Sequence, residues 1–337
     1  MHTRTLGPFN VSAIGFGCMS MSMGYGPADD KASEILLNQS LDLGYTLLDT
    51  AAMYGMGHNE TLIGKALKSR RQEYILASKC GIFKDESGKA SINGRPEVLK
   101  KTCEESLRRL QTEEIDLYYY HRLDKAVPIE ESVGALGDLV TAGKIRTIGL
   151  SEMSSSTLRR AHKEHPISAM QSEYSLWSRT PEFTMLKTCK ELNVSFVPFS
   201  PLARQFLTGK CKDLTHYTDD DIRCTNARPR FEPKAFAQNK KLLVPYARIA
   251  ERADCTMAQL ALAWLLAQDD NIIPIPGTKH SDYLVENAQA GDITLANEVI
   301  EELNELINEN TVSGRRYTDP IMDSTDSEKD REDKINT

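Results

Sequence analysis

The chain has 337 residues, of which 40% are hydrophobic, and its formal net charge is -7 at pH 7. This hydrophobic content allows a substantial buried core and excludes a largely disordered chain. The negative charge argues against general affinity for nucleic acid or anionic membranes, because both need clustered Lys and Arg.

Membrane and secretion signals are not found in the sequence. No apolar stretch approaches the roughly 20 residues that span a bilayer, and residues 1–8 form no apolar signal region. The cysteines are scattered and never form C-x-x-C, so their spacing indicates neither a disulfide framework nor a zinc site. They are Cys18, Cys80, Cys103, Cys189, Cys211, Cys224 and Cys255. We therefore expect a soluble, cytoplasmic protein.

Short apolar runs typical of buried strands alternate with longer stretches of helical spacing. The runs are Ile14–Cys18, Thr46–Asp49, Tyr74–Lys79, Ile115–His121, Ile145–Ser151, Ala169–Glu173, Ser195–Ser200 and Ile272–Pro276. The clearest helical stretches are Arg95–Leu110, Ile129–Ala142, Ser154–Glu164 and Pro181–Leu192. Pro96 suits a first helical turn, and Gly44 and Gly143 stand where helices should end.

This alternation repeats eight times without a change in composition, which favours a closed parallel (β/α)8 TIM barrel in one domain, residues 1–318. The alternative is a doubly wound open sheet, which usually carries a glycine-rich dinucleotide fingerprint after its first strand. Gly15–Ser20 matches that fingerprint only in part, because Ser20 replaces the third small residue and no helix starts there. We therefore favour the barrel.

Three segments depart from the alternation. Thr3–Leu6 and Asn10–Ser12, separated by Gly7-Pro8, are expected to form a hairpin that closes the bottom of the barrel. Residues 200–238, after the seventh strand, form a long insert with little periodicity, and we expect it to cover the site. Residues 319–337 are polar and acidic and are expected to form a mobile tail.

Four ionisable residues lie at or just after the ends of successive predicted strands: Asp49, Tyr54, Lys79 and His121. Barrel enzymes place catalytic groups at the carboxyl ends of strands. Lys79, paired with Asp49, would lower the pKa of Tyr54 from its reference value of about 10. His121 could hydrogen-bond a substrate carbonyl. The set suits protonation of an oxygen that gains negative charge when a hydride is delivered to a carbonyl carbon.

Each of these residues also has an ordinary structural interpretation. A strand-end Lys or Asp often forms a surface salt bridge, a His can be a hydrogen-bonded structural residue, and the glycines around Tyr54 fit a simple turn. Four independent coincidences on one barrel face are a weaker explanation than one shared site.

Seven segments, in order along the chain, resemble the aldo-keto reductase family over about residues 3 to 310. They are Leu48–Gly55, Leu76–Lys79, Tyr118–Arg122, Gly143–Ser151, Gln171–Ser175, Phe199–Leu202 and Ile275–Lys279. Residues 158–177 further resemble the branch that includes pyridoxal reductase and perakine reductase. The resemblance implies a (β/α)8 barrel that binds NADPH/NADP+ in an extended form. It also implies that Tyr54 is the general acid, that Lys79 and Asp49 tune it, and that His121 orients the carbonyl.

The resemblance also implies contacts with the cofactor. The nicotinamide carboxamide would bind Ser151 and Gln171, and its ring would stack on Phe199. The pyrophosphate would follow Ser200, Pro201, Leu202, Arg204 and Lys210. The 2′-phosphate would bind Gly277, Thr278 and Lys279, with Glu286 and Asn287 near the adenine. From their positions on loops, five further residues are expected to rim the substrate pocket, which would suit an apolar or aromatic carbonyl: Met23, Tyr25, Phe83, Arg122 and Trp177. Aromatic residues near strand ends are also common in ordinary packing.

The chain departs from the family pattern at several cofactor positions. Glu152 follows Ser151 where many members have Asn, which puts one carboxamide contact in question. His280 replaces an Arg, so we expect NADPH to be preferred over NADH by a narrower margin than usual. Phe199 replaces the commoner Tyr but keeps a stacking face. Ala203 and Gln205 replace glycines, which is expected to slow opening of the cover loop.

The sequence favours an NADPH-dependent oxidoreductase that reduces aldehydes or ketones to alcohols reversibly. One alternative is a nucleotide-bound regulatory module, as in the potassium-channel β-subunits of this fold, whose partner proteins the sequence does not identify. Another is a metal-dependent hydrolase barrel, which would need a motif such as His-x-His at a strand end. No such pair occurs among His2, His58, His121, His162, His165, His216 and His280, so no metal is expected.

Overall fold

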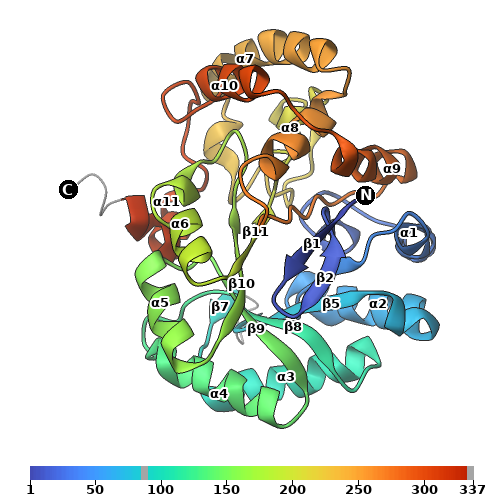
Figure 1. Ribbon diagram of the computed structural model, residues 1–337, viewed down its shortest axis with the longest axis vertical. Coiled ribbons are helices and arrows are strands. Elements are labelled where there is room, and N and C mark those ends of the chain that lie inside the picture. Colours follow the sequence, from blue (N-terminus) through green and yellow to red (C-terminus); the bar gives the residue numbers. More distant parts are fainter. Residues whose placement is uncertain (85–89, 332–337) are drawn as a thin grey trace.

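The computed structural model describes residues 1–84 and 90–331, and Figure 1 shows helices surrounding a central set of strands. The strands are β1 (Thr3–Leu6), β2 (Phe9–Ser12), β3 (Phe16–Gly17), β4 (Leu47–Asp49), β5 (Ile75–Cys80), β6 (Ile82–Lys84), β7 (Ala90–Ile92), β8 (Ile115–Tyr120), β9 (Ile145–Ser151), β10 (Ile167–Glu173) and β11 (Ser195–Phe199). The helices are α1 (Asp30–Asp42), α2 (His58–Leu67), α3 (Pro96–Leu110), α4 (Ile129–Thr141), α5 (Ser155–Glu164), α6 (Met185–Glu191), α7 (Pro233–Arg252), α8 (Met257–Leu266), α9 (Ser281–Gln289), α10 (Asn297–Leu306) and α11 (Asp319–Ser324).

Seven parallel strands form one sheet in the order β11-β10-β9-β8-β5-β4-β3. They correspond to the first seven predicted runs. The eighth run, Ile272–Pro276, is not a regular strand, yet it joins the two edges of the sheet. Ile273 N donates to Phe196 O at 2.9 Å, and Gly17 N donates to Pro276 O at 3.1 Å. The predicted (β/α)8 barrel is therefore confirmed.

Prolines explain why the eighth segment is irregular. Pro274 and Pro276 have no N–H to donate, so each can only accept a hydrogen bond, from Gly15 and from Gly17 of β3 respectively. β3 and the eighth segment also lie very close together: a Cβ on Gly17 would lie 2.7 Å from the carbonyl oxygen of Ile275. Glycine is required there because any side chain would push β3 away and open the barrel.

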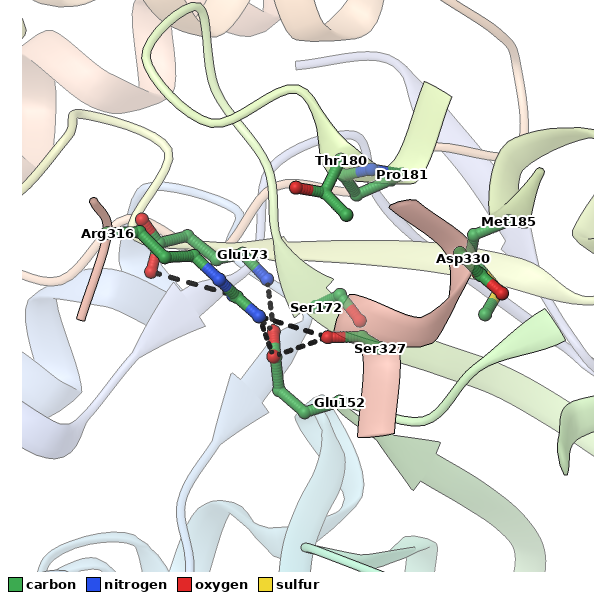
Figure 2. Close-up of a pocket in the computed structure, with 9 residues that line it drawn as sticks. All are labelled: Glu152, Ser172, Glu173, Thr180, Pro181, Met185, Arg316, Ser327 and Asp330. Atoms are coloured by element: carbon green, nitrogen blue, oxygen red, sulfur yellow. Dashed lines mark hydrogen bonds and ion pairs between the residues drawn. The ribbon is translucent and has the colours of Figure 1, made fainter. Parts of the chain in front are cut away.

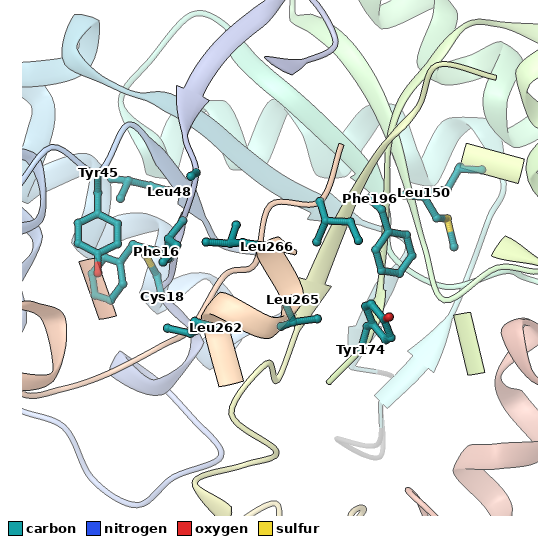
Figure 3. Packing of buried hydrophobic residues seen from close by; sticks show 14 of the residues in the cluster. Phe16, Cys18, Tyr45, Leu48, Leu150, Tyr174, Phe196, Leu262, Leu265 and Leu266 are labelled. Atoms are coloured by element: carbon teal, nitrogen blue, oxygen red, sulfur yellow. Dashed lines mark hydrogen bonds between the residues drawn. The ribbon is translucent and has the colours of Figure 1, made fainter. Parts of the chain in front are cut away.

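Two apolar layers hold the barrel together. Inward-facing residues of the strands, such as Leu117 and Val197, pack in the interior against Leu6, Phe9 and Val11 of the β1–β2 hairpin. The predicted hairpin is confirmed, and it closes one end of the barrel. Outward-facing strand residues pack against the helices, as Figure 3 shows for Leu48, Phe196 and Leu262 among others. A second hairpin, β6–β7, was not expected from the sequence.

The helices follow the predicted pattern. On α3, Leu99, Cys103, Leu107 and Leu110 are buried on one face, and Pro96 occupies the first turn. Gly44 and Gly143 follow α1 and α4 with φ of 86° and 69°, a left-handed conformation that glycine adopts without strain. None of the helices that the structure describes combines the length and apolar character needed to span a membrane.

The insert after β11 packs over the carboxyl end of the barrel rather than extending into solvent. It contains short 3-10 turns at Phe206–Thr208, Leu214–His216 and Arg228–Arg230 before α7 begins at Pro233. Ile222 N donates to Gly24 O at 2.9 Å, so the insert reaches the loop that follows β3. It therefore bridges the first and seventh strands of the barrel, as a covering segment must.

The C-terminal segment differs from the expected mobile tail. Residues 319–331 form α11 and a 3-10 turn at Asp326–Glu328, beside α5 and α6 in Figure 1. Three of its acidic residues, Asp326, Glu328 and Asp330, are buried. Asp326 Oδ2 accepts from Ser154 N at 2.9 Å, and Asp330 Oδ1 accepts from Ser155 N at 2.9 Å, both at the start of α5. The two carboxylates accept from N–H groups at the start of α5 that have no partner within the helix, and the helix dipole favours a negative charge at this end. Residues 332–337 lie outside the described residues.

Candidate active site

The four predicted catalytic residues come together at the carboxyl ends of three neighbouring strands. Asp49 ends β4, Lys79 lies near the end of β5, and His121 directly follows β8. Tyr54 begins a short 3-10 turn after β4. All four side chains are buried, with exposed fractions between 1% and 9%. The parallel pairing of β4, β5 and β8 therefore builds the constellation that the sequence predicted.

Lys79 is the hub of this group. Its Nζ forms an ion pair with Asp49 Oδ1, donates to Thr50 O at 2.8 Å, and lies 3.2 Å from Tyr54 Oη. Three acceptors satisfy the three donors of a buried ammonium. Asp49 Oδ2 also accepts from Gln171 Nε2 at 2.8 Å, so the ion pair extends to β10.

Burial and charge act in opposite directions on these groups. Burial disfavours the Lys79 ammonium, but Asp49 and Tyr54 outweigh this and raise the pKa of Lys79. Burial raises the pKa of Tyr54, and the opposing effect of Lys79 is smaller. The expected direction of the Lys79 effect is right, but the expected net decrease in the Tyr54 pKa is wrong. Desolvation of a phenol is the larger effect because its anion loses nearly all contact with water.

His121 is held in its neutral form. Burial lowers the pKa of His121 well below its usual value, and the nearby Arg122 and Lys79 lower it further. The ring packs edge-on against Tyr54, with centroids 6.1 Å apart and planes at 82°. A neutral imidazole beside the phenol can donate one N–H to a carbonyl oxygen without changing charge at neutral pH.

The loop that carries Tyr54 has three successive residues with a left-handed backbone, of which Met56 alone has a side chain. Gly55, Met56 and Gly57 have φ values of 57°, 55° and 91° in succession. A Cβ on Gly57 would lie 2.6 Å from Arg109 Cδ, so glycine is needed for space as well as for conformation. The tight turn reverses the chain directly after Tyr54 and thereby presents the phenol to Lys79.

Three predicted nicotinamide contacts lie on neighbouring strands β9, β10 and β11. Ser151 ends β9 and its Oγ accepts from Arg122 Nη1 at 3.0 Å. Gln171 Nε2 donates to Asp49 Oδ2, and a side-chain hydrogen bond also links Gln171 to Tyr119. Phe199 ends β11 and is half-buried, whereas the neighbouring Phe196 is fully buried. An aromatic face and two polar groups therefore gather beside the tetrad.

The predicted phosphate contacts are partly engaged within the protein. Lys279 Nζ donates to Tyr25 O and Pro27 O, both at 2.8 Å, and burial lowers its pKa. Arg204 is buried and forms an ion pair with Glu173, 2.6 Å from Nη2 to Oε2. Lys210 is exposed, with its ammonium 4.3 Å from the ring centre of Tyr283 on α9.

The other predicted cofactor residues line the same edge of the barrel. Ser200, Pro201 and Leu202 open the cover loop directly after β11, and Ser200 has a φ of 50°. Gly277 is exposed and Thr278 buried in the segment that follows the eighth run. Glu286 and Asn287 lie on α9, next along the chain, so both groups follow the seventh and eighth strand positions, where barrels often bind phosphate.

Comparison with known proteins agrees with this arrangement. The sequence model of the aldo/keto reductase family matches residues 13–308. The chain belongs to this family. It is 43% identical over 321 residues to an NADP(+) aldo-keto reductase of Schizosaccharomyces pombe, covering 94% of both chains. It is also 41% identical over 311 residues to a probable aldo-keto reductase of Glycine max, covering 92% of this chain and 89% of that one.

Solved structures give the same result. A glycerol dehydrogenase of Gluconobacter oxydans is 28% identical, with a TM-score of 0.83 and coverage of 90% of this chain and 94% of that one. An aldo/keto reductase of Klebsiella pneumoniae, in complex with NADP and acetate, is 26% identical, with a TM-score of 0.72 and coverage of 94% and 99%. The predicted family is confirmed.

The predicted substrate residues of this reductase lie on different segments of the chain. Met23 and Tyr25 follow β3, Phe83 lies on β6, and Arg122 follows His121. Trp177 is 3% exposed and stacks on Phe206 of the cover loop, with ring centres 4.1 Å apart. Its contact with substrate stays a prediction, and its packing shows that it anchors the cover loop.

Sequence reasoning missed two features of the site. Arg223 forms a bidentate ion pair with Asp221 and lies over the rings of Tyr217 and Tyr25, 3.5 and 5.3 Å from their centres. This buried pair fixes the cover loop to the loop after β3. The second feature is Arg316, from the C-terminal segment, which binds Glu152. Neither was predictable from periodicity, because both arginines lie in irregular segments. Arg316 also pairs with a carboxylate far away in the sequence, Glu152.

Proposed function

We propose that this protein catalyses the NADPH-dependent reduction of aldehydes or ketones to alcohols, and the reverse oxidation, with Tyr54 as the general acid. The observation that carries the proposal is the Tyr54 phenol, which lies 3.2 Å from the Lys79 ammonium in a buried site that also contains Asp49 and His121. The NADP(+) relative in Schizosaccharomyces pombe and the NADP complex from Klebsiella pneumoniae support the choice of cofactor.

The residues around the barrel mouth fit a dinucleotide. Phe199 offers a half-buried ring, and Ser151 and Gln171 offer polar groups at the ends of adjacent strands. Near Gly277, Ser20 Oγ is buried without a hydrogen-bond partner among the described residues. It lies 3.6 Å from where a Cβ on Gly277 would be, so a free hydroxyl faces the segment proposed to bind phosphate. Lys279 adds positive charge at this end.

Bound NADPH supplies the hydride that reduces the carbonyl carbon. As negative charge develops on the carbonyl oxygen, the Tyr54 hydroxyl donates its proton to that oxygen. Lys79 lowers the cost of the resulting phenolate, and Asp49 keeps Lys79 charged. The neutral His121 ring donates a hydrogen bond that orients the carbonyl. In the oxidation direction, the Tyr54 phenolate takes the proton from the alcohol.

We propose phosphate binding for fewer residues than the resemblance implies, because Arg204 already binds Glu173. Lys279 keeps one donor beyond the two carbonyls it binds, so it remains the proposed 2′-phosphate ligand. Arg204 is committed to Glu173, and we propose that it shapes the cover loop beside the pyrophosphate. Ser200, Pro201, Leu202, Lys210, Thr278, Glu286 and Asn287 keep their proposed roles along the cofactor.

The substrate class is a separate proposal. The sequence over residues 158–177 favours the branch that includes pyridoxal reductase and perakine reductase, and the Gluconobacter oxydans relative is a glycerol dehydrogenase. A panel with an aromatic aldehyde, pyridoxal and glycerol therefore tests the aromatic and polyol alternatives directly. We also propose a cytoplasmic location, which the seven free cysteines of the described chain support. Cell fractionation tests that location.

The decisive experiment measures NADPH consumption with 4-nitrobenzaldehyde for the wild-type protein and Tyr54→Phe. We expect steady turnover by the wild type and loss of at least about a hundredfold in kcat for Tyr54→Phe, with NADPH binding retained. The Phe variant keeps the ring and removes only the proton donor. Full turnover by Tyr54→Phe would refute the mechanism. NADPH binding without turnover of any panel carbonyl would instead favour the regulatory module.

A further inference from the structure

A buried network of charges lies behind the ends of β9 and β10. Glu152 directly follows β9, Glu173 ends β10, and both are buried. Arg316, between α10 and α11, donates to both carboxylate oxygens of Glu152 at 3.1 and 2.6 Å (Figure 2). It also donates to Glu328 Oε1 at 2.7 Å. Arg316 lies beyond residues 13–308, the part of the chain that the family model matches.

The network continues into the cover loop. Glu173 Oε2 lies 4.0 Å from Arg316 Nη1 and accepts from Arg204 Nη2 at 2.6 Å. The Tyr317 ring is shared by both arginines, with each guanidinium carbon 5.0 Å from its centre. One C-terminal arginine therefore connects the ends of two strands to the first residues of the covering segment.

Both ends of the network have strained backbones. Glu152 has a φ of 54°, and Ala203, Arg204 and Gln205 have φ values of 50°, 55° and 79°. Residues with a side chain adopt this left-handed region at an energetic cost, and they persist there only when surrounding contacts hold them. Ion pairs with Arg316 and Glu173 hold the side chains of Glu152 and Arg204. Ser327 adds two hydrogen bonds to Glu152, one from its hydroxyl and one from its backbone N–H.

These strained residues adjoin the proposed cofactor contacts. Glu152 follows Ser151, and Glu152 N donates to Gln171 O at 2.9 Å. Glu152 Oε1 also accepts from Glu173 N at 2.8 Å. If Glu152 relaxed to an ordinary conformation, the peptide after Ser151 would turn and its bond to Gln171 would break. Loss of the Glu173 pair would similarly release Arg204 from the cover loop.

We propose that Arg316 is a positioning residue for the cofactor. Through Glu152 and Glu173 it holds Ser151 and the start of the cover loop in the conformation that binds the dinucleotide. This inference rests on the proposed function, because it assigns Ser151 and residues 200–204 to NADPH. It makes the C-terminal segment a part of the cofactor site that acts through other residues.

The test compares full-length Arg316→Gln, Arg316→Lys and Arg315→Gln. Arg315 is the matched control, because it is adjacent in sequence but forms an exposed pair with Asp319. The dissociation constant of NADPH is measured by fluorescence titration, and KM for NADPH and kcat by aldehyde reduction. We expect Arg316→Gln to weaken NADPH binding at least about tenfold, with kcat at saturating NADPH within about twofold. Arg316→Lys should be intermediate, and Arg315→Gln unchanged.

A second control separates positioning from general loss of stability. Arg71 pairs with the buried Asp116 near the start of β8, at the opposite end of the strand from His121. Arg71→Gln should lower the Tm without changing the dissociation constant of NADPH. If Arg316→Gln is too unstable to titrate, Arg316→Lys decides the question.

Two results would overturn the inference. The first is that both Arg316 variants bind NADPH with wild-type affinity. The second is that Arg316→Gln loses no more NADPH affinity than Arg71→Gln does, when the two variants have the same Tm. The proposed function fails in a different way, through a wild-type protein that binds NADPH but turns over no carbonyl. The titration still tests Arg316 in that case.

Discussion

Replacement of Lys79 by methionine tests the centre of the site most directly. The ammonium is buried and binds Asp49, Thr50 O and Tyr54 Oη. Lys79→Met keeps a side chain of similar length but leaves the Asp49 carboxylate with Gln171 Nε2 as its remaining charge-stabilising partner in the described structure. Loss of one partner from a buried ion pair costs about 3–5 kcal/mol. We expect a decrease of this size in the free energy of unfolding, measured by urea titration.

The double variant Asp49→Asn/Lys79→Met isolates the charge effect. With both charges removed, no carboxylate is stranded, so we expect it to recover at least about 1 kcal/mol relative to Lys79→Met. Lys65→Met, which breaks an exposed pair with Glu34, is the control and should leave the urea midpoint unchanged. Activity should fall by at least about a hundredfold in both variants that lack Lys79, because Tyr54 loses the group that lowers its pKa.

The reasoning would be refuted if Lys79→Met unfolded at the wild-type urea concentration. It would also be refuted if the double variant were less stable than the single one. Either result would mean that the buried Asp49–Lys79 pair does not depend on mutual charge compensation. Unchanged kcat in Lys79→Met would separately remove Lys79 from the proposed proton transfer.

Three further predictions concern single groups. His121 has a strongly lowered pKa, so kcat for reduction should show no inflection near about pH 6.5, and an inflection there would contradict the neutral assignment. Burial raises the pKa of Glu152, but Arg316 outweighs this and lowers it to about 2. Ionised Glu152 should therefore contribute about 3 kcal/mol to the free energy of unfolding above about pH 4.3, and this contribution should be lost as the pH falls toward 2. Urea titrations of wild type and Glu152→Gln should converge in that range. Lys279→Met should raise KM for NADPH at least about tenfold more than KM for NADH, since only the former carries the 2′-phosphate; equal changes would remove Lys279 from that role.

That the four candidate catalytic residues lie together was predictable, because their signal is local. Asp49, Lys79 and His121 each end a short apolar run, and parallel strands in a barrel bring their carboxyl ends together. Strand order did not have to be known in detail, because alternation with helices already implies it. The packed interior and the closing hairpin follow from the same periodicity.

The direction in which the pKa of Tyr54 shifts was not predictable, because it depends on how completely the phenol is buried. A sequence identifies the neighbouring charge but not the loss of water around it. Trp177 shows the same limit: its position after β10 suggested a pocket rim, whereas its ring packs on Phe206 from a segment about 30 residues away. Contacts between distant segments decide both cases.

The C-terminal segment shows why composition alone misled. Residues 319–331 are rich in charge, and charge-rich segments usually stay in solvent. Here the charges have partners at fixed places: Asp326 and Asp330 bind the start of α5, and Glu328 binds Arg316. Such a segment docks because its carboxylates satisfy donors that the barrel leaves free, which composition does not record.

The departures from the family pattern are connected in the structure. Glu152 stands where many members have Asn, and Ala203 and Gln205 stand where glycines are usual. In the sequence these departures had no visible connection. All three adopt left-handed backbones, and they adjoin the two carboxylate–arginine pairs that meet at Arg316. A backbone that glycine would adopt freely is here maintained by buried ion pairs. If the proposed cofactor site is correct, the C-terminal segment compensates for these substitutions, and removing Arg316 should weaken cofactor binding before it destabilises the barrel.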